Sequence, residues 1–85
     1  MKYQLTNSSD KNGMRLQQIG FVVGTPAEKI KQGDFLMWNF GSVYVVNEVL
    51  RETAKTIVIS TSPNGSDKVY EQKLNKNRLV CILVN

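Results

Sequence analysis

Histidine is absent from this chain of 85 residues, and cysteine occurs only once. Such a chain cannot form the usual zinc sites, a Cys-His dyad or a Ser-His-Asp triad on its own. The six glycines are scattered and form no phosphate-binding loop. A carboxylate pair such as Glu48 and Glu52 is conceivable, but a strand that runs into a turn favours solvated side chains. The sequence therefore predicts no catalysis, no metal site and no cofactor.

Disulfides and long apolar segments are lacking too. Cys81 has no partner, so the fold does not depend on an oxidising compartment. Its surroundings, RLVCILV, predict a buried and unreactive side chain. The amino-terminal residues lack the apolar run of a signal peptide, and no segment approaches the ~20 apolar residues of a membrane span. We expect a cytoplasmic protein.

Charge is only slightly unbalanced. Eleven basic residues against seven acidic ones give a formal charge of +4, and 41% of the residues are hydrophobic. This composition is that of a folded globule, and a chain of this length forms one domain that buries roughly 60 to 65% of its unfolded surface. The second half, residues 51–85, holds six basic and three acidic residues. Any basic surface that attracts an anionic partner should lie there.

Short apolar segments between turn residues predict an all-β fold, as a small barrel or sandwich. In the SPNGSD segment, Pro63 and Asn64-Gly65 are typical of a hairpin turn. RETAK at 51–55 is a weaker turn. The expected strands are 35–39, 43–50, 55–61, 68–74 and 79–84.

The first third of the chain combines a loop, a strand and a short helix. Residues 1–13 are expected to be flexible, or an edge strand followed by a loop. Residues 14–23 alternate in two registers, which favours one strand with a bulge or a bend. Within TPAEKIKQGD, Thr25 as the N-cap, Pro26, Glu28 and Gly33 predict a short capped helix, with Ala27 and Ile30 facing inward.

The segment FLMWNFGSVYVV, residues 35–46, contains four of the seven aromatic residues. A three-residue turn at Asn39-Phe40-Gly41 fits best, because a two-residue turn would require a positive φ at phenylalanine. Met37 then pairs with Val43. The face that carries Phe35, Met37, Val43 and Val45 is expected to be core.

The opposite face of this hairpin has three possible roles. It can be covered within the monomer, it can be an oligomer or protein interface, or it can be a platform on which planar ligands stack. Its residues are the candidate partner-binding residues Leu36, Trp38, Phe40 and Tyr44. The strand at 79–84 is apolar on both faces and has the same ambiguity.

Basic residues of the second half are the candidate phosphate contacts. Cations beside exposed aromatic rings hold single-stranded nucleic acid by phosphate contacts and base stacking. A solvated strand edge that discourages aggregation is the simpler interpretation. The candidates are Arg51, Lys55, Lys68, Lys73, Lys76 and Arg78.

Two stretches, TPAEKIKQGDFLMWNFGSVYVVNEV and VYEQKLNKNRLVCI, resemble small uncharacterised proteins of bacteriophages and prophages, over roughly residues 25–82. The Gly-Asp entry at 33–34 resembles SH3-like barrels and also the self-splicing Hint fold, whose chemistry requires a histidine that is missing here. The resemblance implies a protein made in a bacterial host, and it transfers no binding residues.

We therefore expect an SH3-like barrel of five or six strands with one short helix. Its expected role is a non-catalytic, nucleic-acid-associated binding module. The alternative is a protein-interaction or homo-oligomeric module that uses the same aromatic face, such as an inhibitor of a host or defence protein, or a virion component.

Overall fold

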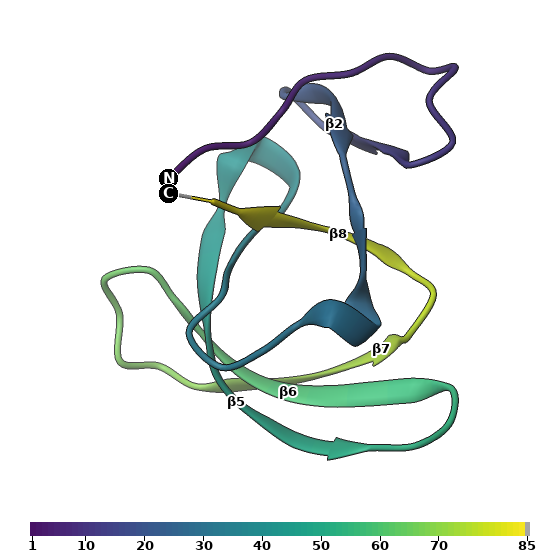
Figure 1. Cartoon of the computed structure of the whole chain (residues 1–85). Helices are drawn as coiled ribbons and strands as arrows, with labels where there is room; N and C mark the ends of the chain where they lie inside the picture. The colour runs from purple at the N-terminus through teal and green to yellow at the C-terminus, as the bar shows by residue number, and fades with distance from the viewer. Residues whose placement is uncertain (85) are drawn as a thin grey trace.

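The computed structural model describes residues 1–84, and eight strands are found there (Figure 1). Single 3-10 turns, η1 (Ala27–Lys29) and η2 (Asn39–Gly41), are the helical elements of the described chain. None of its helices is therefore long or apolar enough to cross a membrane. The strands are β1 (Gly13–Leu16), β2 (Gly20–Val23), β3 (Thr25–Pro26), β4 (Phe35–Met37), β5 (Val43–Glu52), β6 (Thr56–Pro63), β7 (Tyr70–Asn75) and β8 (Leu79–Leu83).

The strands form a six-stranded antiparallel sheet and a separate β1-β2 hairpin. The order in the large sheet is β3-β8-β4-β5-β6-β7. The sheet curls, so that β8 and the β6-β7 pair lie on opposite sides of the interior (Figure 1). It stays open, because β3 and β7 each pair with one strand only. The all-β prediction is confirmed, whereas the expected SH3-like barrel is not seen as a closed barrel.

The five predicted strands from residue 35 onward correspond to β4 to β8, with ends that differ by up to two residues. Residues 14–23 are different, because they form two strands and not one bulged strand. Gln17 and Gln18 make the turn, with Gln18 at φ 65°, and the Ile19 N–H donates to the Leu16 carbonyl over 3.1 Å. The change of register in the sequence therefore marks a hairpin.

The predicted capped helix is reduced to the single 3-10 turn η1. Thr25 and Pro26 pair with Val80 and Leu79 as strand β3, and no side chain caps the η1 turn that follows. The Ala27 N–H donates to the Arg78 carbonyl over 2.8 Å, so strand pairing and a contact with the β7-β8 connection replace the helical bonds. Ala27 and Ile30 are buried, as predicted.

The amino-terminal residues pair with two strands. Lys2 bridges to Val84, and Leu5 bridges to Val22 of β2. The loop that follows contains an Asx turn, in which the Asp10 carboxylate accepts the Asn12 N–H and the Thr6 hydroxyl. These two bonds lower the pKa of Asp10. The edge-strand alternative for residues 1–13 therefore describes this segment better than a free tail.

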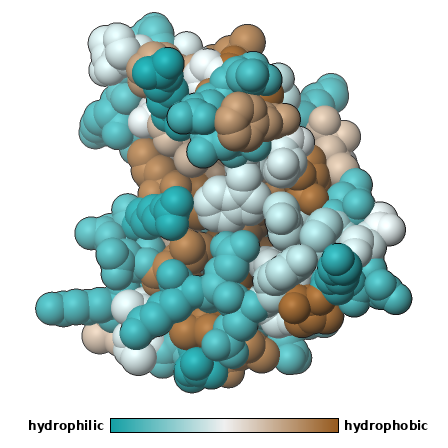
Figure 2. All heavy atoms as spheres, turned by 180° about the vertical axis from the view of Figure 1, so that it is seen from behind, coloured by the Kyte–Doolittle hydropathy of each residue, from teal (hydrophilic) through white to brown (hydrophobic). Residues whose placement is uncertain are grey.

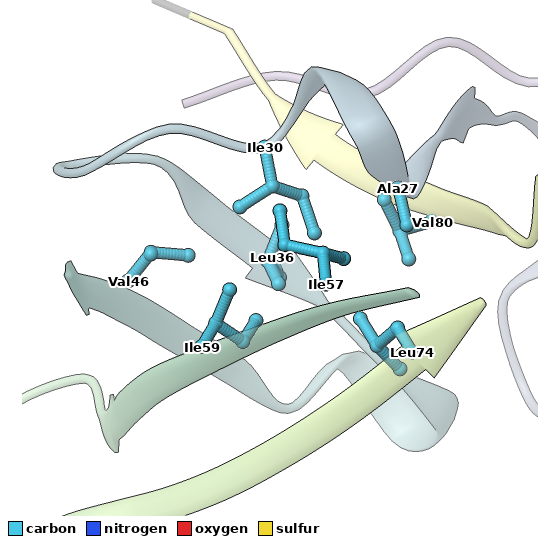
Figure 3. Close-up of a cluster of buried hydrophobic side chains, with 8 residues drawn as sticks. All are labelled: Ala27, Ile30, Leu36, Val46, Ile57, Ile59, Leu74 and Val80. Atoms are coloured by element: carbon cyan, nitrogen blue, oxygen red, sulfur yellow. The ribbon is translucent and has the colours of Figure 1, made fainter. Parts of the chain in front are cut away.

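One cluster of buried side chains fills the interior of the curled sheet (Figure 3). Leu36 of β4 is in it and is 0% exposed, although the sequence analysis placed Leu36 on the partner-binding face. A residue without exposed surface cannot contact a partner, so the structure removes Leu36 from the candidates. The members are Ala27, Ile30, Leu36, Val46, Ile57, Ile59, Leu74 and Val80.

A second cluster lies on the other side of β4 and β8. Leu16 and Val22 of the β1-β2 hairpin pack there against Met37 and Cys81. Cys81 is buried, as predicted, and its burial raises the pKa of the thiol. The face of the β4-β5 hairpin that was expected to be core is therefore not the one that enters the main interior. None of Phe35, Met37, Val43 and Val45 belongs to the main cluster: Met37 is in the smaller cluster, Val43 packs against that cluster, and Phe35 and Val45 are only partly buried.

We expect Leu36→Ala to lower the free energy of unfolding by about 2–5 kcal/mol, because it leaves a cavity in the main cluster. Urea denaturation measures this change. Leu50→Ala is the matched control: Leu50 is 38% exposed on β5, and its truncation should change stability by less than about 1 kcal/mol. Equal effects of the two substitutions would contradict the burial of Leu36.

Candidate functional site

The β4-β5 turn has the predicted register and length. Met37 pairs with Val43, and the Trp38 N–H donates to the Ser42 carbonyl over 2.8 Å, which leaves three residues in the turn. Its conformation differs from the prediction, since Phe40 as well as Gly41 has a positive φ, at 65° and 79°. A left-handed conformation costs a residue with a Cβ about 1–2 kcal/mol. The turn is therefore strained at Phe40.

Beyond the main cluster, the inner face of the sheet continues into aromatic and polar side chains. Side chains two apart on a strand share a face. Tyr44 thus lies on the same face of β5 as buried Val46, and Gln72 and Tyr70 lie on the same face of β7 as buried Leu74. Toward this end of the sheet, the inward-facing side chains change from apolar to aromatic and polar.

A pocket of about 380 Å³ opens at this place. It brings together three residues that the sequence analysis selected, the rings of Trp38 and Tyr44 and the cation Arg78. The other contributors are uncharged polar side chains that were not among the candidate binding residues. The lining residues are Trp38, Asn39, Ser42, Tyr44, Gln72 and Arg78.

Trp38 forms one wall of this aromatic pocket. Its ring packs against the main cluster, and the Arg78 guanidinium carbon lies 5.5 Å from the ring centroid, in cation–π range. The indole Nε1–H is buried and has no hydrogen-bond acceptor among residues 1–84. A planar cation thus covers the indole, whose polar edge is unpaired.

The ring of Tyr44 packs against the ring of Tyr70, which belongs to the edge strand β7. Its ring centroid lies 6.4 Å from that of Tyr70, and the planes are inclined by 68°, an edge-to-face arrangement. Tyr70 is 46% exposed. Neither Tyr70 nor Gln72 was among the candidate residues. The alternation Tyr70-Gln72-Leu74 could have indicated both, because the apolar Leu74 shows which face of that strand points inward.

The six candidate phosphate contacts do not form one surface. Arg51 pairs with Glu71 over 3.7 Å, and Lys76 pairs with Glu52 over 3.3 Å. Such exposed pairs contribute little to stability but partly cancel the charge. Within residues 1–84 no ion pair is found for the other four candidates, Lys55, Lys68, Lys73 and Arg78.

The cations are also separated in space. Lys55 and Lys76 line a second pocket, of about 480 Å³, with Asn75, whereas Arg51 and Lys73 flank Val58 on the outer face of the sheet. Arg78 alone among the six lines the aromatic pocket. The sequence predicted several cations beside the aromatic rings, but only Arg78 lies beside those of Trp38 and Tyr44.

Phe40 lies at the tip of the turn, outside the residues that line the aromatic pocket. Its side chain is 59% exposed. Other exposed apolar side chains, such as Leu5, Val69 and Val84, lie far apart in the sequence. Figure 2 shows one face of the molecule, where hydrophobic patches alternate with hydrophilic side chains and no single patch dominates.

Comparison with known proteins adds no relative. No family model matches the chain, and no curated protein or solved structure matches it either. The residues described here also include no group of three or more His, Cys, Asp or Glu side chains that could hold a metal ion. The functional proposal therefore rests on the geometry of the aromatic pocket.

We expect Trp38→Phe to leave the free energy of unfolding unchanged, or to raise it by about 1 kcal/mol. Phenylalanine keeps an aromatic ring on the main cluster and removes a buried donor that has no acceptor. Trp38→Ala should instead cost about 2–3 kcal/mol, because the packing is lost. Urea denaturation followed by circular dichroism measures both, and a large loss in Trp38→Phe would show that the indole N–H has a partner.

Proposed function

We propose that this chain is a non-catalytic module that binds single-stranded nucleic acid through the aromatic pocket. The observation that carries the proposal is the position of Arg78, a cation without an ion-pair partner in the described structure, on the ring of Trp38 and beside Tyr44. A guanidinium stacked on an aromatic ring keeps an outer face for a base and N–H groups for a phosphate.

The size of the pocket favours one planar group. Its volume of about 380 Å³ lies at the lower end of the range for small-molecule sites, roughly 300–1,000 Å³. Asn39, Ser42 and Gln72 offer hydrogen bonds to the edges of a base.

Charge supports an anionic ligand. The chain carries +4, and Lys55, Lys68 and Lys73 are free of ion pairs within residues 1–84. They can attract the backbone of a strand that extends beyond the pocket. The resemblance to phage proteins, and a place in the cytoplasm of a bacterial host, stay predictions that no comparison tests.

A protein-interaction or homo-oligomeric module is the second candidate. It is favoured by β7, an edge strand whose exposed Tyr70 packs against Tyr44 of the same pocket. An extended segment of a host protein, a virion component or a second copy could pair with such an edge. The aromatic pocket would then be buried in the interface.

We expect a labelled single-stranded oligonucleotide to bind the full chain, with an affinity that falls as salt rises. One to three phosphate contacts give a slope of about −0.7 to −2 in a plot of log K against log salt. Tyr44→Ala should weaken binding by about 1–3 kcal/mol, roughly 5- to 150-fold, and Arg78→Ala should also lower the salt slope. Fluorescence anisotropy measures each of these quantities.

Arg15→Ala is the matched control, since Arg15 is an exposed cation on the separate β1-β2 hairpin. It should leave both affinity and slope nearly unchanged. Two results together would reject nucleic-acid binding and support the second candidate. They are the absence of oligonucleotide binding at low salt, and a dimer in solution that dissociates to monomers in Tyr70→Ala.

A further inference from the structure

Phe40 combines two features that folding does not explain. It adopts a left-handed conformation, with φ 65° and ψ 13°, which glycine or asparagine would adopt with less strain. Its ring is 59% exposed, so burial of the side chain recovers little of that strain. Conformational strain that neighbouring contacts maintain is typical of functional positions.

The turn that carries Phe40 is held by the turn of the β1-β2 hairpin. The Phe40 N–H donates to the Gln17 carbonyl over 2.8 Å, and the Gln17 N–H donates to the Asn39 side-chain oxygen over 2.8 Å. Gln18, next in the chain, has the same φ of 65°. Each turn thus fixes the other, and the ring of Phe40 is exposed on a turn of defined geometry.

Asn39 connects this pair of turns with the aromatic pocket. Its side-chain oxygen accepts the bond from Gln17, and the residue itself lines the pocket beside Trp38. Phe40 is the next residue along the chain. Consecutive Cα atoms lie about 3.8 Å apart, so the exposed ring of Phe40 is attached within one residue of the pocket lining.

We infer that Phe40 is a second stacking residue, which takes the nucleotide adjacent to the one in the pocket, so that the site spans at least two nucleotides. This inference rests on the proposed binding of single-stranded nucleic acid. Base stacking needs an aromatic face and little else, which fits an exposed phenylalanine ring. The hydrogen bonds with Gln17 then maintain the strained turn conformation in which the ring of Phe40 is exposed.

The test uses a thymidine mononucleotide and the corresponding dinucleotide as probes, followed by NMR chemical-shift titration. The wild-type chain should bind the dinucleotide at least about fivefold more tightly. Phe40→Gly should abolish this advantage and leave the affinity for the mononucleotide unchanged. Its Tm should be unchanged or a few degrees higher, because glycine relieves the strain.

Gln18→Gly is the matched control. It relieves the same strain on the facing turn and removes no ring, so it should alter Tm in the same direction and keep the advantage of the dinucleotide. Phe40→Leu retains an apolar side chain without an aromatic face. If Phe40→Gly lowers Tm, Phe40→Leu decides: binding of the dinucleotide as in the wild-type chain overturns the inference.

The outcomes separate the two proposals. Binding of the mononucleotide with sensitivity to Tyr44→Ala, but no gain from a second nucleotide, overturns the role of Phe40 alone. Failure of both probes and of longer oligonucleotides to bind at low salt overturns the proposed function and, with it, this inference.

Discussion

Burial on both faces of β4 and β8 is the constraint on which the rest of the structure depends. Alternate side chains of these strands enter different clusters, with Leu36 and Val80 in the main interior and Met37 and Cys81 under the β1-β2 hairpin. A shift of register by one residue would exchange the two sets of side chains, and each set packs against different residues. The central strands can therefore occupy only one register, which fixes the position of Trp38 at the end of β4.

The aromatic pocket follows from this arrangement. The main cluster draws on strands that extend past it, and the next inward positions on β5 and β7 are Tyr44 and Gln72. The edge strands of the sheet, β3 and β7, do not pair with each other. Arg78, which immediately precedes β8, lies over the ring of Trp38. The pocket thus lies where the apolar interior ends, beside side chains such as Trp38, Tyr44 and Arg78 that have an apolar body and a polar tip.

Local patterns in the sequence predicted the strands after residue 34, the pairing of Met37 with Val43 and the aromatic residues of the pocket. They failed where tertiary contacts decide. Both faces of 35–37 are apolar, so alternation alone could not show which side was the main interior, and Leu36 was misplaced. Thr25 has the chemistry of a helix cap, but pairing with Val80 uses its backbone as a strand. Candidate cations close in sequence were separated because they belong to different elements: Lys73 is on β7, whereas Lys76 and Arg78 lie in the connection to β8.

The position of Cys81 has a consequence for how the molecule opens. The β1-β2 hairpin is a separate sheet that covers this thiol, whereas the larger cluster includes no residue of that hairpin. Sub-global opening follows such boundaries, so the hairpin can detach while the larger sheet keeps its hydrogen bonds. In that partly opened form Cys81 becomes accessible to thiol reagents, and the β4-β5 turn loses its contacts with Gln17. The rate of thiol labelling in the native protein would then report how often the turn that carries Phe40 is released.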